Sequence, residues 1–325
     1  MKKILLINIF LTQSIFLFSQ YNLQTCTTDI ADDVPQFFRE YFSCVTIKMS
    51  ENDNYTNIYF NNLPPHESWY YPEGNDNYIE YYSLGDSYKK NPGQIKEFDY
   101  VISVPNNPVE IDGAEKGENA ADYTSGTDAN EYPMSSVGVA LNGVSLFNPF
   151  TGPQETIEEE FYSFDVYGGH PAPTGDYHYH TASLGPLEVL KHKELITNTN
   201  PGSAEIEIYG VMCDGVVVMG CNELNTETAN LSSTDAQNGH KHDIINEKGE
   251  VLFENRYHTH ICYDSITDED TNRNGYNDYE FVPESSYYQS EGVGNSNICK
   301  ASSSPVEPDK EYSNLSSSLQ LSPTI

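Results

Sequence analysis

The segment at residues 174–181 sets tyrosine and histidine in strict alternation, as Tyr177-His178-Tyr179-His180. Proline and glycine flank the run, which is typical of the turns that bound a β-strand. Successive side chains of a strand point to opposite faces, so the two histidines should share one face and the two tyrosines the other. The Cα atoms of His178 and His180 would then lie about 6–7 Å apart, close enough for both imidazoles to reach one ion.

The histidines are concentrated in one part of the chain. All nine lie between His66 and His260, and eight of them lie at or after His170. The Tyr-His-x-His pattern returns at residues 257–260, and a third His-x-His pair stands at residues 240–242. Scattered surface or core histidines do not cluster in this way, so the pattern predicts a shared site.

Clustered imidazoles without a Cys-x-x-Cys pair favour a zinc or copper site and argue against a thiolate zinc site. The sequence predicts one metal centre from the two Tyr-His-x-His segments, joined by other histidines and by two carboxylates near turns. Such carboxylates can orient imidazoles by accepting their second N–H. The predicted metal residues are His178, His180, His258, His260, His170, His240, Asp214 and Asp243.

Other interpretations of these side chains stay open. The histidines and tyrosines could form a hydrogen-bonded polar layer between strands, without an ion. More than four converging histidines would allow a dinuclear centre and metal-activated water, with Tyr177, Tyr179 or a turn carboxylate as the proton relay. His66, in a proline-rich turn, is a further candidate, whereas His192 between two lysines is expected on the surface.

The rest of the chain predicts a mainly β fold (β-rich α+β) of short strands and hairpins with long loops, few short helices and stabilising disulfides. The 25 tyrosines and 18 prolines favour strands and turns over helices. Two apolar segments with a central Asn-Gly or Asp-Gly, residues 135–150 and 205–220, predict hairpins that supply the core. The best helical candidates are short, at residues 34–42, 157–162 and 186–195.

The ends of the chain differ in composition from its middle. Residues 1–20 have two lysines followed by an apolar run, which is typical of a secretory signal peptide. We expect a small N-terminal cap at 21–54, the main domain at 55–265, an acidic segment at 266–300 and a disordered Ser/Pro-rich tail at 301–325. No later run is apolar enough to cross a membrane, so we expect the mature chain outside the cell or at its surface.

The chain is strongly acidic, with 16 Lys and Arg against 49 Asp and Glu and a formal net charge of −33. Such a surface repels phosphate backbones, which argues against nucleic-acid binding and makes cations the natural partners. A matrix component or a glycan is a further candidate partner for the tyrosine-rich surface.

One acidic loop has the spacing of a calcium site. Its oxygen side chains alternate and are followed by a glycine, as in D-x-[DN]-x-[DN]-G loops. The loop lacks the glutamate that ends an EF-hand loop, because Phe281 stands there, so a shorter type of calcium loop is the better match. An acidic linker is the alternative. The predicted calcium ligands are Asp270, Asn272, Asn274 and Asp278.

The six cysteines form an even set in a chain that we expect to be secreted, which favours three disulfides. Six cysteines allow 15 pairings. Proximity along the chain suggests Cys26–Cys44, Cys213–Cys221 and Cys262–Cys299.

Several ordered motifs resemble those of the YHYH family, a group of secreted and cell-surface proteins named for this tetrapeptide. They are NNLPPHE at 61–67, VGVALNGVSLFNP at 137–149, GGHPAPTGDYHYHT at 168–181, YGVMCDGVVVMG at 209–220, NGHKHD at 238–243 and RYHTHI at 256–261. The resemblance covers about residues 55–263 and identifies the main domain as a YHYH domain. Three valines follow Asp214-Gly215 where the family usually has an apolar-aromatic-proline run, and Thr259 replaces a tyrosine. The resemblance implies no particular reaction.

The sequence therefore favours a secreted YHYH-domain protein that binds zinc or copper through clustered histidines. A metal-dependent hydrolase or oxidoreductase with a histidine-rich centre is one alternative, although no G-x-S-x-G, H-E-x-x-H or phosphate-binding glycine loop is present. The other alternative is a structural or adhesion protein with bound calcium and a hydrogen-bonded Tyr/His core.

Overall fold

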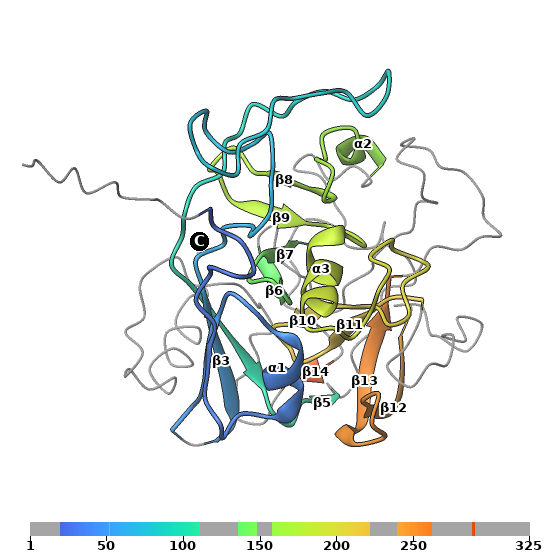
Figure 1. Cartoon of the computed structure of the whole chain (residues 1–325). Helices are drawn as coiled ribbons and strands as arrows, with labels where there is room; N and C mark the ends of the chain where they lie inside the picture. The colour runs from blue at the N-terminus through green and yellow to red at the C-terminus, as the bar shows by residue number, and fades with distance from the viewer. Residues whose placement is uncertain are drawn as a thin grey trace, which may run out of the picture.

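Figure 1 shows the computed structural model, which describes residues 20–51, 53–110, 136–147, 158–221, 239–261 and 288–289. These residues confirm the predicted mainly β fold with few, short helices. The predicted disulfide between Cys26 and Cys44 is present. No helix in the described part of the chain is long and apolar enough to cross a membrane.

The smaller sheet has four strands in chain order, and its first two strands are parallel. Its strands are β1 (Asp29–Ile30), β2 (Thr46–Met49), β3 (Tyr55–Phe60) and β4 (Tyr100–Pro105). Helix α1 (Gln36–Tyr41) buries Phe37, Phe38 and Tyr41. Strand β2 lies before the expected domain boundary at residues 54 and 55, and β3 after it, yet the two pair along their length, so one sheet spans both segments.

The larger sheet has eight strands in the order β12-β13-β11-β10-β6-β7-β9-β8. Figure 1 shows them following one another from β8 near the top to β12 at the lower right, with α3 over the middle. The strands are β6 (Ser136–Ala140), β7 (Ser145–Phe147), β8 (Gly169–Pro171), β9 (Tyr177–Tyr179), β10 (Ile208–Met212), β11 (Val217–Met219), β12 (Gly239–Ile245) and β13 (Val251–His260). The remaining elements are α2 (Glu158–Phe161), α3 (Leu184–His192) and the β5 (Val109–Glu110) and β14 (Tyr288–Gln289) pair.

The strand order is symmetric about the β6–β10 pair. Strands β6, β7, β9 and β8 follow one another in one half, and β10, β11, β13 and β12 follow in the same way in the other. Their first strands pair antiparallel, and Val139 lies opposite Val211. Residues 137–147 and 209–219 align without a gap, so these valines occupy equivalent positions. The flanking hydrogen bonds are also reciprocal: the N–H at 141 donates to the carbonyl at 209, and the N–H at 213 to the carbonyl at 137, both at 3.0 Å. An approximate two-fold axis therefore passes through the Val139–Val211 pair.

Each half begins with a hairpin, as predicted. Gly143 and Gly215 turn the chain with positive φ angles of 72° and 92°, which glycine adopts without strain. Each glycine N–H donates to the carbonyl three residues earlier at 3.0 Å. The two turns are thus the same structure, built from an Asn-Gly in one half and an Asp-Gly in the other.

The hairpin register shows that the predicted Cys213–Cys221 pair is wrong. Cys213 follows β10 at the turn, whereas Cys221 follows β11 at the open end. At least four strand residues, about 13 Å, separate them, and a disulfide spans Cα atoms no more than about 7 Å apart. Both are nevertheless disulfide-bonded. The predicted pair of Cys262 and Cys299 lies outside the described residues.

The tyrosines of β9 point into the interior, away from the histidines. The Tyr177 hydroxyl donates to both carboxylate oxygens of Asp165 at 2.9 Å, and Ser68 donates to the same carboxylate. Burial raises the pKa of Asp165 to about 6 from its ordinary 3.8. This buried carboxylate anchors the strand that carries His178.

We expect Gly210→Ala to lower the free energy of unfolding by about 3 kcal/mol through overpacking. A Cβ there would lie 2.2 Å from the Val139 carbonyl oxygen, and one at the equivalent Gly138 would lie 2.6 Å from the Val211 oxygen. Gly249→Ala is the matched control, because its Cβ meets nothing within 4 Å and only its positive φ is unfavourable. Urea unfolding measures both changes, and equal losses would contradict the tight approach of β6 and β10.

We expect the contribution of Asp165 to stability to fall as the pH rises from its unfolded to its folded pKa. Its folded pKa of about 6 exceeds the ordinary 3.8, so the folded chain holds the proton more tightly than the unfolded chain does. The free energy of unfolding of the wild type, minus that of Asp165→Asn, should fall by up to about 3 kcal/mol from about pH 4 to about pH 7. Thermal unfolding across this range tests it, with the exposed Asp99→Asn as control. Parallel curves for the wild type and Asp165→Asn would exclude the effect.

Candidate metal sites

The histidines of the larger sheet form two groups, one in each half. We call them the first site (His170, His178 and His180) and the second site (His240, His242, His258 and His260). Strands β7, β6, β10 and β11 separate β9 from β13, which places the groups about 24 Å apart along the sheet. The predicted single centre from both Tyr-His-x-His segments is therefore wrong.

The first site is a buried cross-strand cluster. His170 on β8 lies opposite His178 on β9, and His180 follows two residues later on the same face. The three residues are at most 4% exposed, and one nitrogen of each lies within 4.8 Å of the others. The Nε2 atoms of His178 and His180 are 3.0 Å apart. Two nitrogens on one ion at 2.0–2.1 Å would be about 2.9–3.4 Å apart, so these rings are already spaced as ligands.

Hydrogen bonds on the outer side of the rings fix which nitrogen faces the cluster. His178 Nδ1 donates to the Asp176 carbonyl oxygen at 2.8 Å, which leaves the Nε2 lone pair toward His180. His170 Nδ1 lies 2.6 Å from the Ser163 hydroxyl oxygen and 3.5 Å from a carboxylate oxygen of Glu160. A ligating histidine is usually held in this way through its second nitrogen.

Aromatic rings cover the first site. Phe147 stacks on His178 with centroids 3.8 Å apart and planes 11° apart. Phe164 meets His170 edge-on at 4.9 Å and lies parallel to His180 at 5.9 Å. These rings and the contacts of Ser163 and Glu160 could not be identified from the sequence, because none of these residues forms a recognisable motif with the histidines.

Burial sets the protonation of the first site. It lowers the pKa of His170 and of His178 well below 6.5, and the neighbouring histidines lower both further. The imidazoles of His170 and His178 are therefore neutral at neutral pH. Neutral imidazole is the form that ligates a metal ion.

The second site has the same construction. His240 on β12 lies opposite His258 on β13, and the Nε2 atoms of His240 and His260 are 3.1 Å apart. Ligand atoms of His240, His242 and His258 lie within 4.8 Å of one another. Backbone carbonyls again accept from Nδ1: that of residue 256 from His258 at 3.1 Å, of residue 220 from His260 at 2.8 Å, and of Asp243 from His242 at 2.8 Å.

The two sites are equivalent under the two-fold relation. In both, the histidine of a Gly-His dipeptide lies opposite the histidine of a Tyr-His dipeptide, and the Nδ1 of the latter donates to the carbonyl two residues earlier. The equivalent residues are His170 and His240, His178 and His258, and His180 and His260. The second site adds His242 and is less enclosed, because His240 and His242 are only half-buried.

The other predicted site residues lie outside the two clusters. The Asp243 carboxylate accepts the Asn255 N–H at 2.7 Å, and the Asp214 carboxylate accepts the Val216 N–H in the hairpin turn at 3.3 Å. Backbone carbonyls orient His178, His242, His258 and His260 instead, and the side chains of Ser163 and Glu160 orient His170. His192 is exposed, as predicted. The predicted calcium ligands Asp270, Asn272, Asn274 and Asp278 lie outside the described residues.

His66 lies on the tyrosine face of β9. Its Nε2 is 2.9 Å from the Tyr179 hydroxyl, its ring stacks on Tyr167 at 3.7 Å, and burial lowers its pKa to about 3. Asn62, from the same motif, accepts the Ser145 N–H at 2.7 Å and donates to the Tyr177 carbonyl at 2.9 Å. This motif therefore holds β7 and β9 in place rather than supplying a ligand to the first site.

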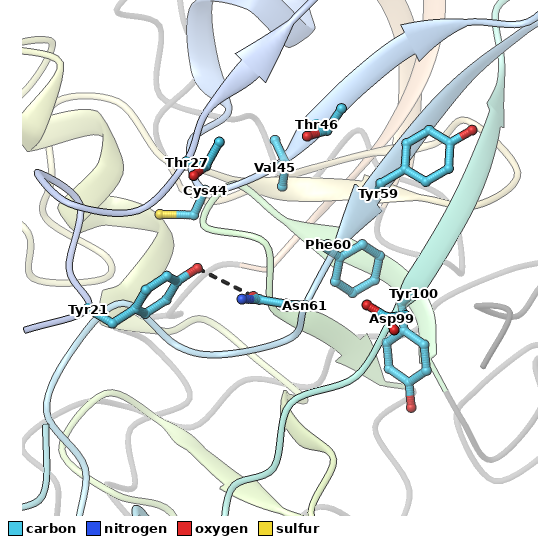
Figure 2. A pocket seen from close by; sticks show the side chains of 10 residues that line it. All are labelled: Tyr21, Thr27, Cys44, Val45, Thr46, Tyr59, Phe60, Asn61, Asp99 and Tyr100. Atoms are coloured by element: carbon cyan, nitrogen blue, oxygen red, sulfur yellow. Dashed lines mark hydrogen bonds between the residues drawn. The ribbon is translucent and has the colours of Figure 1, made fainter. Parts of the chain in front are cut away.

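Figure 2 shows a cavity of about 310 Å³ away from the histidines. Its wall includes Cys44 of the N-terminal disulfide, and the Tyr21 hydroxyl donates to the Asn61 side-chain oxygen at 3.3 Å across one side. No histidine lines this cavity, so it is not part of either metal site.

Comparison with protein-family models matches the YHYH protein family over residues 118–289. The match includes every histidine of both sites, and the motif at residues 61–67 precedes it. No curated protein and no solved structure matches the chain. Because the matched range is more than half of the 325 residues, the chain belongs to the YHYH protein family.

Proposed function

We propose that this protein is a secreted metal-binding protein that holds one transition-metal ion at each of its two histidine sites. The observation that carries the proposal is the first site, where ligand atoms of three buried imidazoles converge within 4.8 Å. Burying polar rings is costly unless their nitrogens have partners, and an ion would satisfy all three at once. Disulfide bonding fits an oxidising compartment outside the cytosol.

The donor atoms favour zinc or copper. Calcium and magnesium prefer oxygen ligands, whereas both sites offer imidazole nitrogens. Three ligands at the first site would leave a fourth position open to water, as in catalytic zinc sites, whereas four histidines at the second could close the coordination shell. A metal-dependent hydrolase or oxidoreductase at the first site is therefore the second candidate function.

We expect elemental analysis of the mature protein, purified without chelators or a histidine tag, to give two ions per chain. His178→Ala with His180→Ala should remove the ion of the first site, because only one imidazole remains there. His240→Ala with His258→Ala should remove the other ion. His192→Ala, at an exposed histidine outside both sites, should retain both.

Circular dichroism of each variant shows whether the fold survives. Folded double variants that keep the full metal content would contradict the proposal, as would a wild-type protein that stays metal-free after dialysis against zinc and against copper.

We also expect the two ions to leave at different rates. Phe147 and Phe164 cover the buried first site, whereas His240 and His242 of the second are half-buried, so a chelator should strip the second site first. Transfer of the metal to a coloured chelator, followed by absorbance, should show a fast and a slow phase of equal size. The His240→Ala/His258→Ala variant should lack the fast phase. Loss of the slow phase instead would reverse the assignment.

A further inference from the structure

A second cavity, of about 350 Å³, lies beside the first site. One of its walls is Phe164, the ring that also packs against His170 and His180. Small-molecule sites are typically concave and of about 300–1,000 Å³, so the volume suits a single ring with small substituents. Its lining includes Tyr88, Phe161, Phe164, Tyr167, Ser183 and Leu184.

Among the described lining residues, Ser183 is the one with a buried side-chain polar atom that has no hydrogen-bond partner. It lines the cavity, is 2% exposed, and its hydroxyl has no hydrogen-bond partner among the described residues. It also stands at the N-cap position of α3 without making the usual side-chain cap. A buried hydroxyl without a partner is unfavourable, and a serine N-cap normally satisfies a helix amide instead. A ligand hydroxyl would satisfy this group.

The N-terminus of α3 also favours a ligand oxygen at this position. The helix has nine residues and no acidic residue in its first turn, and Leu184 lines the cavity. The positive end of the helix dipole favours an oxygen that carries partial negative charge. An oxygen bonded to Ser183 would lie in that field.

The other lining residues favour a ligand without a net charge. Four aromatic rings surround the space, and no lysine, arginine or histidine lines it, so a full anion would lack a counter-charge. Asp165 is the one acidic residue of the lining, and Tyr177 and Ser68 already donate to its carboxylate oxygens. A cation would therefore meet a carboxylate already engaged in hydrogen bonds and the positive end of α3. A neutral aromatic ring with one hydroxyl fits all these contacts.

We propose that this cavity binds a small phenol, with the aromatic ring packed against the Phe161 and Phe164 pair and the hydroxyl on Ser183. The inference does not depend on an ion at the first site. It rests on the cavity, the buried Ser183 hydroxyl and an aromatic lining without lysine, arginine or histidine.

Fluorine NMR of ligand binding to the full mature protein tests this proposal. The probes are 4-fluorophenol, 4-fluorotoluene, 4-fluorobenzoate and 4-fluorobenzylamine, which share a ring and differ in the polar group. We expect 4-fluorophenol to bind with a Kd of roughly 1 mM or tighter, ahead of the other three. Ser183→Ala should weaken 4-fluorophenol about 2- to 10-fold and leave 4-fluorotoluene unchanged, because it removes one neutral hydrogen bond.

Two further variants control the experiment. Ser103→Ala, on β4 of the smaller sheet and outside the cavity lining, should leave all affinities unchanged. Leu84→Trp should fill the cavity and abolish binding of both neutral probes. Equal affinities for 4-fluorophenol and 4-fluorotoluene, tighter binding of either charged probe, or no saturable binding would overturn the proposal. The titration uses chelator-treated protein, so a failure to bind metal would not affect it.

Discussion

The antiparallel pairing of β6 with β10 is the constraint on which the larger sheet depends. It sets Val139 opposite Val211, and each half of the sheet is built outward from that pair. Gly138 and Gly210 permit the close approach, since a Cβ on either would meet the opposite backbone. A one-residue slip would turn every side chain of a strand to the other face, so the histidine faces depend on this register.

Because side chains alternate along a strand, β9 buries its tyrosines on one face and its histidines on the other. The tyrosine hydroxyls are satisfied by Asp165, His66 and Asn142 in the interior, and the imidazoles by Asp176 and by one another on the opposite face. Hydrogen bonds on both faces offset the cost of burying these groups. The polar layer that the sequence suggested as an alternative to a metal centre is therefore present on the tyrosine side of the same strand.

Local patterns in the sequence predicted most of the local structure, although proximity along the chain paired Cys213 with Cys221 wrongly. Alternation placed His178 and His180 on one face, Asn-Gly and Asp-Gly marked the two hairpin turns, and proximity paired Cys26 with Cys44. The partner of each histidine could not be predicted in this way, because it depends on strand order. The repeated order of Gly-His before Tyr-His-x-His, at residues 169–180 and 239–260, was the signal for two sites. Phe147 and Phe164 carried no such signal, since apolar residues near a hairpin are expected in any core.

Duplication gives two sites with one backbone plan and different surroundings, so their chemistry need not be the same. The second site has a fourth histidine and access to solvent, which suits a filled coordination shell and exchange of the ion. The first has three histidines and is closed by Phe164, whose ring also lines the neighbouring cavity. A ligand in that cavity and an ion at the first site would both act on this ring. Any effect of one on the affinity of the other must then be reciprocal, because the two bindings share one free-energy cycle.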